Sequence, residues 1–230
     1  MTRPQRHEVQ LWLVLSLICM GVYVAWPTLD LQVARWFYAP DIGFAAVQWP
    51  WVNVWHESVP WVGRAMLLCS LWVWGLRSRV TSPATHRKAL ALTIGLIIGL
   101  WFIMNAGFKD NWGRARPNEI SAFGGTETYT PPLVPSSACD TNCSFMSGHA
   151  GTGFVLMTVG ALATTRTRRR WLVIGWTAGL ALGLIRMAQG GHFLGDVLFG
   201  GLLLWGCAWA TRWFYVRWRA KRIFCRTIPT

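Results

Sequence analysis

The sequence predicts an all-α, polytopic membrane protein with six transmembrane helices and a long outer loop between helices three and four. The chain of 230 residues is 53% hydrophobic and only 13% charged. Several uncharged apolar runs reach about 20 residues, the length that crosses a bilayer as a helix. The 17 tryptophans fit amphipathic rings at the two membrane–water interfaces. We therefore expect residues 1–230 to form a single six-helix domain.

The first span is expected at residues 9–29, which carry no charge and end near Trp26 and Pro27. This run has no small-residue cleavage site and further spans follow it, so we expect a retained helix and not a removed signal. Residues 30–60 form a mixed loop rich in aromatic side chains, and we expect it to lie along the membrane interface.

The second span has the weakest signal. Residues 65–76 supply only 12 positions, so the span must begin upstream and include Arg64. A helix in a soluble core is the alternative. Residues 77–88 are a polar, basic turn, and residues 89–108 are an uncharged third span of 20 residues.

A long loop at residues 109–149 separates the third span from the fourth. It is rich in Gly, Pro, Thr and Ser, and long loops of this kind usually carry function. The remaining elements are a fourth span at 150–165, a tight basic turn at 166–170, a fifth span at 171–185, a sixth at 197–211 and a basic tail at 212–230.

The basic residues predict the orientation. The N-terminal segment, the turns at 77–88 and 166–170, and the tail hold 16 of the 22 Lys and Arg residues and one acidic residue, Glu8. The positive-inside rule therefore places both termini in the cytoplasm, and the long loop and residues 190–195 outside. Because the basic residues alternate with apolar runs and form no single patch, the net charge of +13 does not indicate nucleic-acid binding.

Three cations open the long loop, namely Lys109, Arg114 and Arg116, and Pro117 follows them. They break the orientation pattern, so they are candidates for function. Arg offers a planar fork to phosphate oxygens and Lys offers a point charge. The cluster favours an anionic ligand, and a basic rim that binds lipid headgroups is the alternative.

The same loop ends in Ser147, Gly148 and His149, just before the fourth span. Ser147 is placed as a helix N-cap, and the free N–H groups beside Gly148 would make an anion site. His149 at that position can donate a proton to a leaving group. The alternative is an ordinary serine cap with an incidental histidine.

The third group stands between the fifth and sixth spans: Arg186, the turn Gly190-Gly191, His192 and Asp196. Residues four apart on a helix share a face, so Asp196 can hold one ring nitrogen of His192 and leave the other free as base or nucleophile. The alternative is a capping aspartate and a snorkelling arginine. All three groups fall on the predicted outer face, which favours one composite site.

In chain order the motifs read Lys109-x6-Arg116-Pro117, Ser147-Gly148-His149 and Arg186-x5-His192-x3-Asp196. Their order and spacing resemble the three-part signature of the type 2 phosphatidic acid phosphatase superfamily. Two positions depart from it: Met146 stands where the second motif usually has Pro, and Ile185 stands where the third usually has Ser. Neither change removes a group that the chemistry needs.

The resemblance implies phosphoryl transfer without a metal or another cofactor. His192 would attack phosphorus and form a phosphohistidine, and Asp196 would orient its ring. His149 would protonate the leaving oxygen and then activate water. The phosphate would be held by five residues: Lys109, Arg116, Ser147, Gly148 and Arg186.

The implied function is a membrane lipid phosphatase that hydrolyses a lipid phosphate or pyrophosphate monoester at the outer face. Candidate substrates are polyprenyl pyrophosphate, phosphatidylglycerol phosphate, phosphatidate and lipid A. A lipid-to-lipid phosphotransferase with the same first step is one alternative. A non-catalytic lipid transporter is another, although charges gathered at one face disfavour it. Topology and family together imply a bacterial cytoplasmic membrane with a periplasmic active site; the expected partners are the lipid phosphate and membrane lipids.

Cys139 and Cys143 lie in the outer loop just before the Ser-Gly-His turn. In an oxidising compartment we expect them to form a disulfide that stiffens this turn, and two free thiols are the alternative.

Three further cationic or titratable residues have no place in the family pattern. Arg114 is expected either to contact a second phosphate or headgroup or to face solvent. His56 and Arg64 could line a route into the site, although structural roles are favoured because both residues are isolated.

Overall fold

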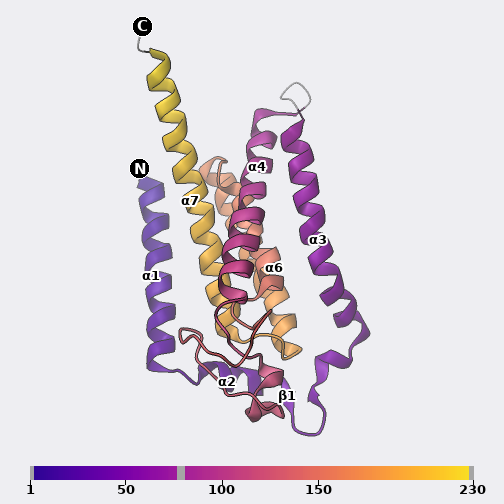
Figure 1. Cartoon of the computed structure of the whole chain (residues 1–230). Coiled ribbons are helices and arrows are strands. Elements are labelled where there is room, and N and C mark those ends of the chain that lie inside the picture. Colours follow the sequence, from indigo (N-terminus) through magenta and orange to yellow (C-terminus); the bar gives the residue numbers. More distant parts are fainter. Residues whose placement is uncertain (1–2, 77–80, 228–230) are drawn as a thin grey trace.

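The computed structural model of the chain describes residues 3–76 and 81–227 and consists mainly of long helices (Figure 1). The α-helices are α1 (Arg3–Ala25), α2 (Leu29–Arg35), α3 (Pro50–Gly75), α4 (Pro83–Ile94), α5 (Gly148–Phe154), α6 (Thr165–Ala188) and α7 (Leu194–Thr227). The π-helix η2 (Gly95–Lys109) continues α4, and the 3₁₀ helix η5 (Val155–Gly160) continues α5. Smaller elements are the 3₁₀ helices η1 (Ala45–Gln48), η3 (Pro117–Glu119) and η4 (Ser121–Phe123) and the strands β1 (Tyr38–Ala39) and β2 (Gly43–Phe44).

Among the described residues, four helical segments are long and apolar enough to cross a membrane: Arg6–Ala25, Pro83–Lys109, Thr165–Ala188 and Leu194–Trp218. They correspond to the first, third, fifth and sixth predicted spans. The second and fourth spans stay predictions. Helix α3 has 26 residues, whereas α5 and η5 are only 7 and 6 residues long.

Several predicted boundaries are wrong. Helix α1 ends at Ala25, because Pro27 disfavours a helical residue before it, and α2 begins separately at Leu29. The predicted basic turn at 166–170 is helical, since α6 begins at Thr165 and arginine is a good helix former. The predicted tail is helical too, because α7 extends to Thr227.

The polar turn expected at residues 77–88 is only partly described. Residues 77–80 lie outside the described part of the chain, as do 1–2 and 228–230. Helix α4 begins with the N-cap Ser82, whose hydroxyl accepts a hydrogen bond from the Thr85 N–H at 3.1 Å, and Pro83 occupies the first turn.

The predicted mixed loop at residues 30–60 contains α2, a small antiparallel hairpin and the start of α3. In the hairpin Tyr38 pairs with Phe44. The rings of Tyr38, Phe44 and Phe123 form a second apolar cluster, with centroids 5.0–5.5 Å apart. This cluster ties the hairpin to the long loop, at the end of the bundle opposite both termini (Figure 1).

The main core surrounds α5, whose residues from Ala150 to Phe154 are all buried. Close packing there depends on glycine. A Cβ atom on Gly153 would lie 2.5 Å from the backbone nitrogen of Gly179 in α6, and a Cβ on Gly179 would lie 2.2 Å from the Phe154 ring. Small residues at helix crossings let backbones approach within membranes, and this contact fixes α5 against α6.

We expect Gly153→Ala to lower stability, because backbone atoms of α6 cannot move away from a new methyl group. Overpacking of this kind costs about 1–3 kcal/mol. Thermal unfolding of the purified protein in detergent measures the loss. Gly21→Ala in α1 is the matched control, since no heavy atom lies within 4 Å of its added Cβ. Equal stability of the two variants would contradict the packing described.

Candidate active site

His192 is held in one tautomer by a backbone carbonyl. Its Nδ1 lies 2.7 Å from the Ser144 carbonyl oxygen, which can only accept, so Nδ1 carries the hydrogen. Its Nε2 atom is buried and has no hydrogen-bond partner within the described chain. A buried ring nitrogen with a free lone pair is suited to act as a base or a nucleophile.

Asp196 supports this histidine less directly than the sequence predicts. The distance from His192 Nδ1 to Asp196 Oδ2 is 3.7 Å, so the ring's hydrogen bond goes to Ser144 instead. Asp196 Oδ2 accepts from the Ser144 hydroxyl at 2.5 Å and from the Phe193 N–H at 2.7 Å. Asp196 is in the first turn of α7 and reaches back to satisfy the amide just before it, as in a capping box. It therefore fixes both Ser144 and the start of α7, and through them the ring.

The environment of Arg114 differs from both alternatives that the sequence predicts. It neither faces solvent nor is free to reach a second phosphate or headgroup, because its side chain is fully buried between two carboxylates. Its Nη2 lies 2.7 Å from Asp30 Oδ2, and its Nη1 contacts Asp196 Oδ1. Its Nε donates to the Thr130 carbonyl at 2.8 Å. A buried arginine requires this kind of full pairing, so the cation is committed to structure.

Asp30 completes the network and was not among the predicted site residues. It accepts hydrogen bonds from the Tyr23 hydroxyl at 2.7 Å and from the Gly195 N–H at 2.8 Å. Burial raises the pKa of Asp30, whereas Arg114 favours its charged form. Burial also works against the charged form of Arg114, but the charges of Asp196 and Asp30 raise its pKa above the ordinary value. The sequence contains one hint of this pairing: Asp30 falls on the same predicted face as Arg114, an arginine with no place in the family pattern.

The predicted phosphate-binding residues Lys109 and Gly148 are neighbours. Lys109 is the last residue of η2, and Gly148 opens α5. A Cβ atom on Gly148 would lie 3.7 Å from Lys109 Nζ and 2.9 Å from Asn105 Oδ1. A larger residue at position 148 would therefore press on the Asn105 side chain, whereas its contact with Lys109 would be an ordinary one. Ser147 is the N-cap of α5, as the sequence predicts, because its Oγ accepts a hydrogen bond from the Ala150 N–H at 3.4 Å.

Arg186 is buried at the end of α6. Its Nη1 donates to Gln189 Oε1 at 2.7 Å, while its Nε is buried without a hydrogen-bond partner in the described chain. A Cβ on Gly191 would lie 2.2 Å from Arg186 Nη2, so a larger residue at this position would displace the guanidinium. Arg116 is less enclosed, and its Nη2 donates to the Asn142 carbonyl at 2.5 Å.

A cavity of about 370 Å³ opens beside this site between α3 and η2. It includes three predicted site residues, Lys109, Gly148 and His149; the other lining residues are Val59, Pro60, Gly63, Arg64, Leu100, Trp101, Asn105, Asn142 and Thr152. The predicted residues Ser147, Arg186 and His192 are buried and are not among the lining residues.

His56 lies against His149, and Arg64 lines the cavity. The His56 ring stacks on the His149 ring at a centroid distance of 4.6 Å, and its carbonyl oxygen lies 3.0 Å from His149 Nε2. Arg64 lines the cavity, and its guanidinium lies 4.6 Å from the centre of the Trp61 ring. His56 thus positions His149, and Arg64 borders the space in front of it.

The surroundings of both predicted catalytic histidines favour the neutral form of the ring. Burial lowers the pKa of His192 to about 3, and Lys109 and Arg186 act in the same direction against Asp196. Burial and the charge of Arg186 lower the pKa of His149 to about 3. Both pKa values are lowered for the same two reasons: the rings are shielded from water, and cations lie near them. An anion bound among these cations would raise both pKa values.

The end of the long loop is fixed to its beginning. The Cys143 N–H donates to the Lys109 carbonyl at 3.0 Å, and the Ser144 N–H donates to the Arg114 carbonyl at 2.8 Å. The structure has a disulfide between Cys139 and Cys143, directly before this paired segment. These links bring the first and second motifs together around Ser144.

Comparisons with known proteins cover the region that holds the three motifs. The sequence model of the PAP2 superfamily matches residues 89–222, which include all three motifs. A lipid A 4'-phosphatase of Francisella tularensis subsp. novicida is 33% identical over 214 residues, which cover 89% of this chain and 94% of that protein.

Two further relatives match over a shorter region. Lipid A 4'-phosphatases of Rhizobium leguminosarum and Rhizobium etli are each 30% identical over 125 residues, or 53% of this chain. The matches cover 53% and 48% of those proteins, about half their length. No solved structure matches the chain.

We expect Arg114→Met to destabilise the protein strongly, because it leaves Asp30 and Asp196 buried without their cation. Removing one partner from a buried ion pair costs about 3–5 kcal/mol. Thermal unfolding in detergent measures the loss, and Arg35→Met, at an exposed arginine of α2, is the control.

Adding Asp30→Asn to Arg114→Met should recover part of the lost stability, since one uncompensated charge is then removed. Additive losses in this double-mutant cycle would show that the two side chains are not coupled.

Proposed function

This chain belongs to the PAP2 superfamily, and from that membership we propose that it is a membrane lipid phosphatase that forms a phosphohistidine at the outer face. The observation that carries the mechanism is the buried, unpartnered Nε2 of His192, with the opposite ring nitrogen fixed on Ser144. The substrate class we favour is a lipid A phosphate monoester, because the relative matched over nearly its whole length is named a lipid A 4'-phosphatase.

In the first step, His192 Nε2 attacks phosphorus. A P–N bond forms, the bond from phosphorus to the lipid oxygen breaks, and its electron pair stays on that oxygen. His149 protonates the oxygen as it leaves. Lys109 and Arg186, together with the predicted ligands Arg116, Ser147 and Gly148, stabilise the charge on the phosphoryl oxygens.

In the second step, water attacks the phosphohistidine. His149, now neutral, takes a proton from the water, the P–N bond breaks and inorganic phosphate leaves. His192 Nδ1 keeps its hydrogen bond to Ser144 throughout, so the ring returns to its starting tautomer. The cations supply the charge stabilisation, and the mechanism uses no metal.

His149 must carry a proton before it can act as the acid. The substrate-free site disfavours that proton through burial and the charge of Arg186. A phosphate monoester brings up to two negative charges to the same cations. Its binding therefore raises the pKa of His149, so that this residue is protonated only when substrate is bound.

The cavity between α3 and η2 is where we place the body of the lipid. His149 and Lys109 line it, and the acid must stand beside the leaving oxygen. Trp101 and Val59, from the two helices, give it apolar walls. A lipid that lies there would present its phosphate to His192 and leave its sugar or alcohol portion near Arg64.

We assign the chain to a bacterial cytoplasmic membrane with both termini in the cytoplasm and the site facing the periplasm. The positive-inside pattern supports this assignment. The arrangement of the chain is compatible with it, because the N- and C-termini lie at one end of the bundle and α2 and β1 at the other (Figure 1).

We expect His192→Ala to abolish turnover, because no other group can form the covalent intermediate. Phosphate release from a panel of lipid phosphates, including lipid A, by purified protein in detergent with EDTA tests this. Wild-type protein should remain active in EDTA. Near-normal release by the variant would refute the nucleophile, and loss of wild-type release in EDTA would refute the metal-free mechanism.

We expect His149→Ala to reduce turnover of lipid phosphates about 10²–10⁴-fold. The loss should be smaller for an aryl phosphate, whose leaving oxygen needs no proton. His86→Gln in α4 is the control for removal of a histidine outside the site. Equal losses for good and poor leaving groups would argue against an acid role for His149.

A further inference from the structure

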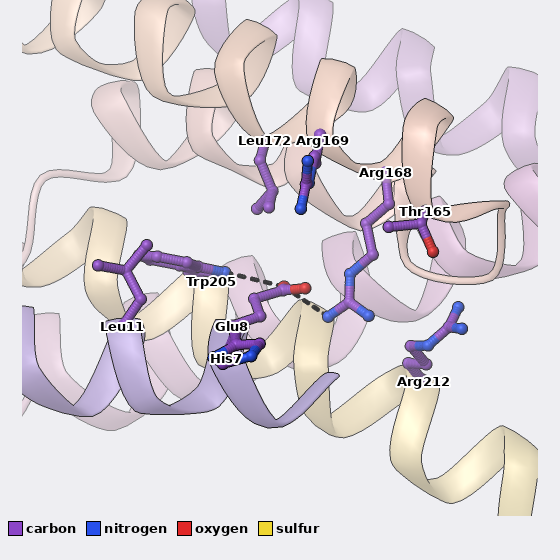
Figure 2. A pocket seen from close by; sticks show the side chains of 9 residues that line it. All are labelled: His7, Glu8, Leu11, Thr165, Arg168, Arg169, Leu172, Trp205 and Arg212. Atoms are coloured by element: carbon purple, nitrogen blue, oxygen red, sulfur yellow. Dashed lines mark hydrogen bonds and ion pairs between the residues drawn. The ribbon is translucent and has the colours of Figure 1, made fainter. Parts of the chain in front are cut away.

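A second cavity lies at the end of the bundle that carries the termini, away from the candidate active site. Its volume is about 190 Å³. Residues of α1, α6 and α7 line it, as Figure 2 shows: His7, Glu8, Leu11, Thr165, Arg168, Arg169, Leu172, Trp205 and Arg212. None of them takes part in the proposed phosphatase mechanism.

The cavity has an excess of positive charge. It contains three arginines and one acidic residue, Glu8. Glu8 Oε1 accepts from Arg168 Nη2 at 2.5 Å and from Trp205 Nε1 at 3.2 Å, as the dashed lines in Figure 2 show. Arg169 and Arg212 have no carboxylate partner within the described chain, so about two positive charges are left without a counterion.

Arg212 also has an unsatisfied donor. Its Nη1 donates to the Ala161 carbonyl at 3.0 Å and to the Ala163 carbonyl at 3.2 Å. Its Nε is buried without a hydrogen-bond partner in the part of the chain that the structure describes. An unpaired buried donor is costly, so a ligand oxygen in the cavity would relieve a real penalty.

The N-terminus of α6 adds to the positive potential. This helix of 24 residues begins at Thr165, which lines the cavity, and its N-cap Thr164 makes no side-chain capping bond. The first N–H groups of a helix have no partner within it, and together with the helix dipole they favour an anion. The arginines and the N-terminus of α6 therefore both contribute to the positive electrostatic potential in this cavity.

The walls of the cavity favour a lipid over a free anion. Leu11, Leu172 and Trp205 make them largely apolar. Helices α1, α6 and α7 are all candidate spans, and only 6% of the α1 span is buried within the protein. Hydrocarbon chains must cover the remaining surface of α1, so the apolar side of the cavity is continuous with a lipid-facing surface.

We propose that this cavity binds an anionic phospholipid of the leaflet opposite the active site. Its phosphate lies between Arg169, Arg212 and the start of α6, and an acyl chain follows Leu11 and Leu172. Bound in this way, the lipid would join α1 to α6, next to the Glu8–Arg168 ion pair. Basic residues at the ends of spans are the usual means of recognising such headgroups.

The test is lipid binding by the full chain, measured by native mass spectrometry in detergent with phosphatidylglycerol or phosphatidylcholine of matched acyl chains. Wild-type protein should retain phosphatidylglycerol about tenfold better. Arg169→Gln should reduce this preference about fivefold, and Arg212→Gln should do the same. The matched controls are Arg170→Gln on α6 and Arg217→Gln on α7, neither of which lines the cavity.

Three outcomes would overturn the proposal: no headgroup preference in wild-type protein, equal losses in the control variants, or displacement of phosphatidylglycerol by inorganic phosphate alone. The last result would identify a site for a soluble anion. If Arg212→Gln fails to fold, Arg169→Gln decides, because that side chain is exposed. Hydrolysis of an aryl phosphate should be unchanged in Arg169→Gln, which confirms that the variant is folded.

Discussion

The buried ion network of Asp30, Arg114 and Asp196 is the constraint on which the site depends. It joins the segment after α1, the long loop and the start of α7, three parts of the chain far apart in sequence. A buried charge without its partner is costly. If one of these three segments moved away, it would leave a charge on another segment buried and unpaired. Asp196 also binds the Ser144 hydroxyl, and the Ser144 carbonyl holds the His192 ring. The position of the His192 ring therefore follows from the network.

The same site separates charges that hold structure from charges that are available for a ligand. Arg114 is fully neutralised by two carboxylates, whereas buried Lys109 and Arg186 have no carboxylate partner within the described residues. Burial lowers the pKa of His192, and the uncompensated charges of Lys109 and Arg186 act in the same direction. In the proposed mechanism a phosphate would balance these charges, so substrate binding and protonation of His149 would both follow from one arrangement of cations.

Packing explains how such a polar site is tolerated at the end of an apolar bundle. The short helix α5 carries the Ser-Gly-His motif at one end and glycine contacts with α6 at the other. Gly153 and Gly179 allow the two backbones to touch, and Gly148 lies in the first turn beside Asn105 and Lys109. Rigid support close to the reacting groups keeps their geometry without requiring further buried charges. The second cationic cavity is lined by other residues, from α1, α6 and α7.

The sequence by itself predicted six spans and the three motifs, and four of those spans coincide with helices long and apolar enough to cross a membrane, because long apolar runs and motif spacing are local properties of the chain. It also identified the family, which the comparisons confirmed. Tertiary structure alone decided that Arg114 is paired with Asp30 and that Ser144 and not Asp196 accepts the His192 hydrogen bond. The reason is physical: a buried charge or ring nitrogen takes its partner from whichever segment the fold brings within about 3 Å, and local sequence does not specify that segment.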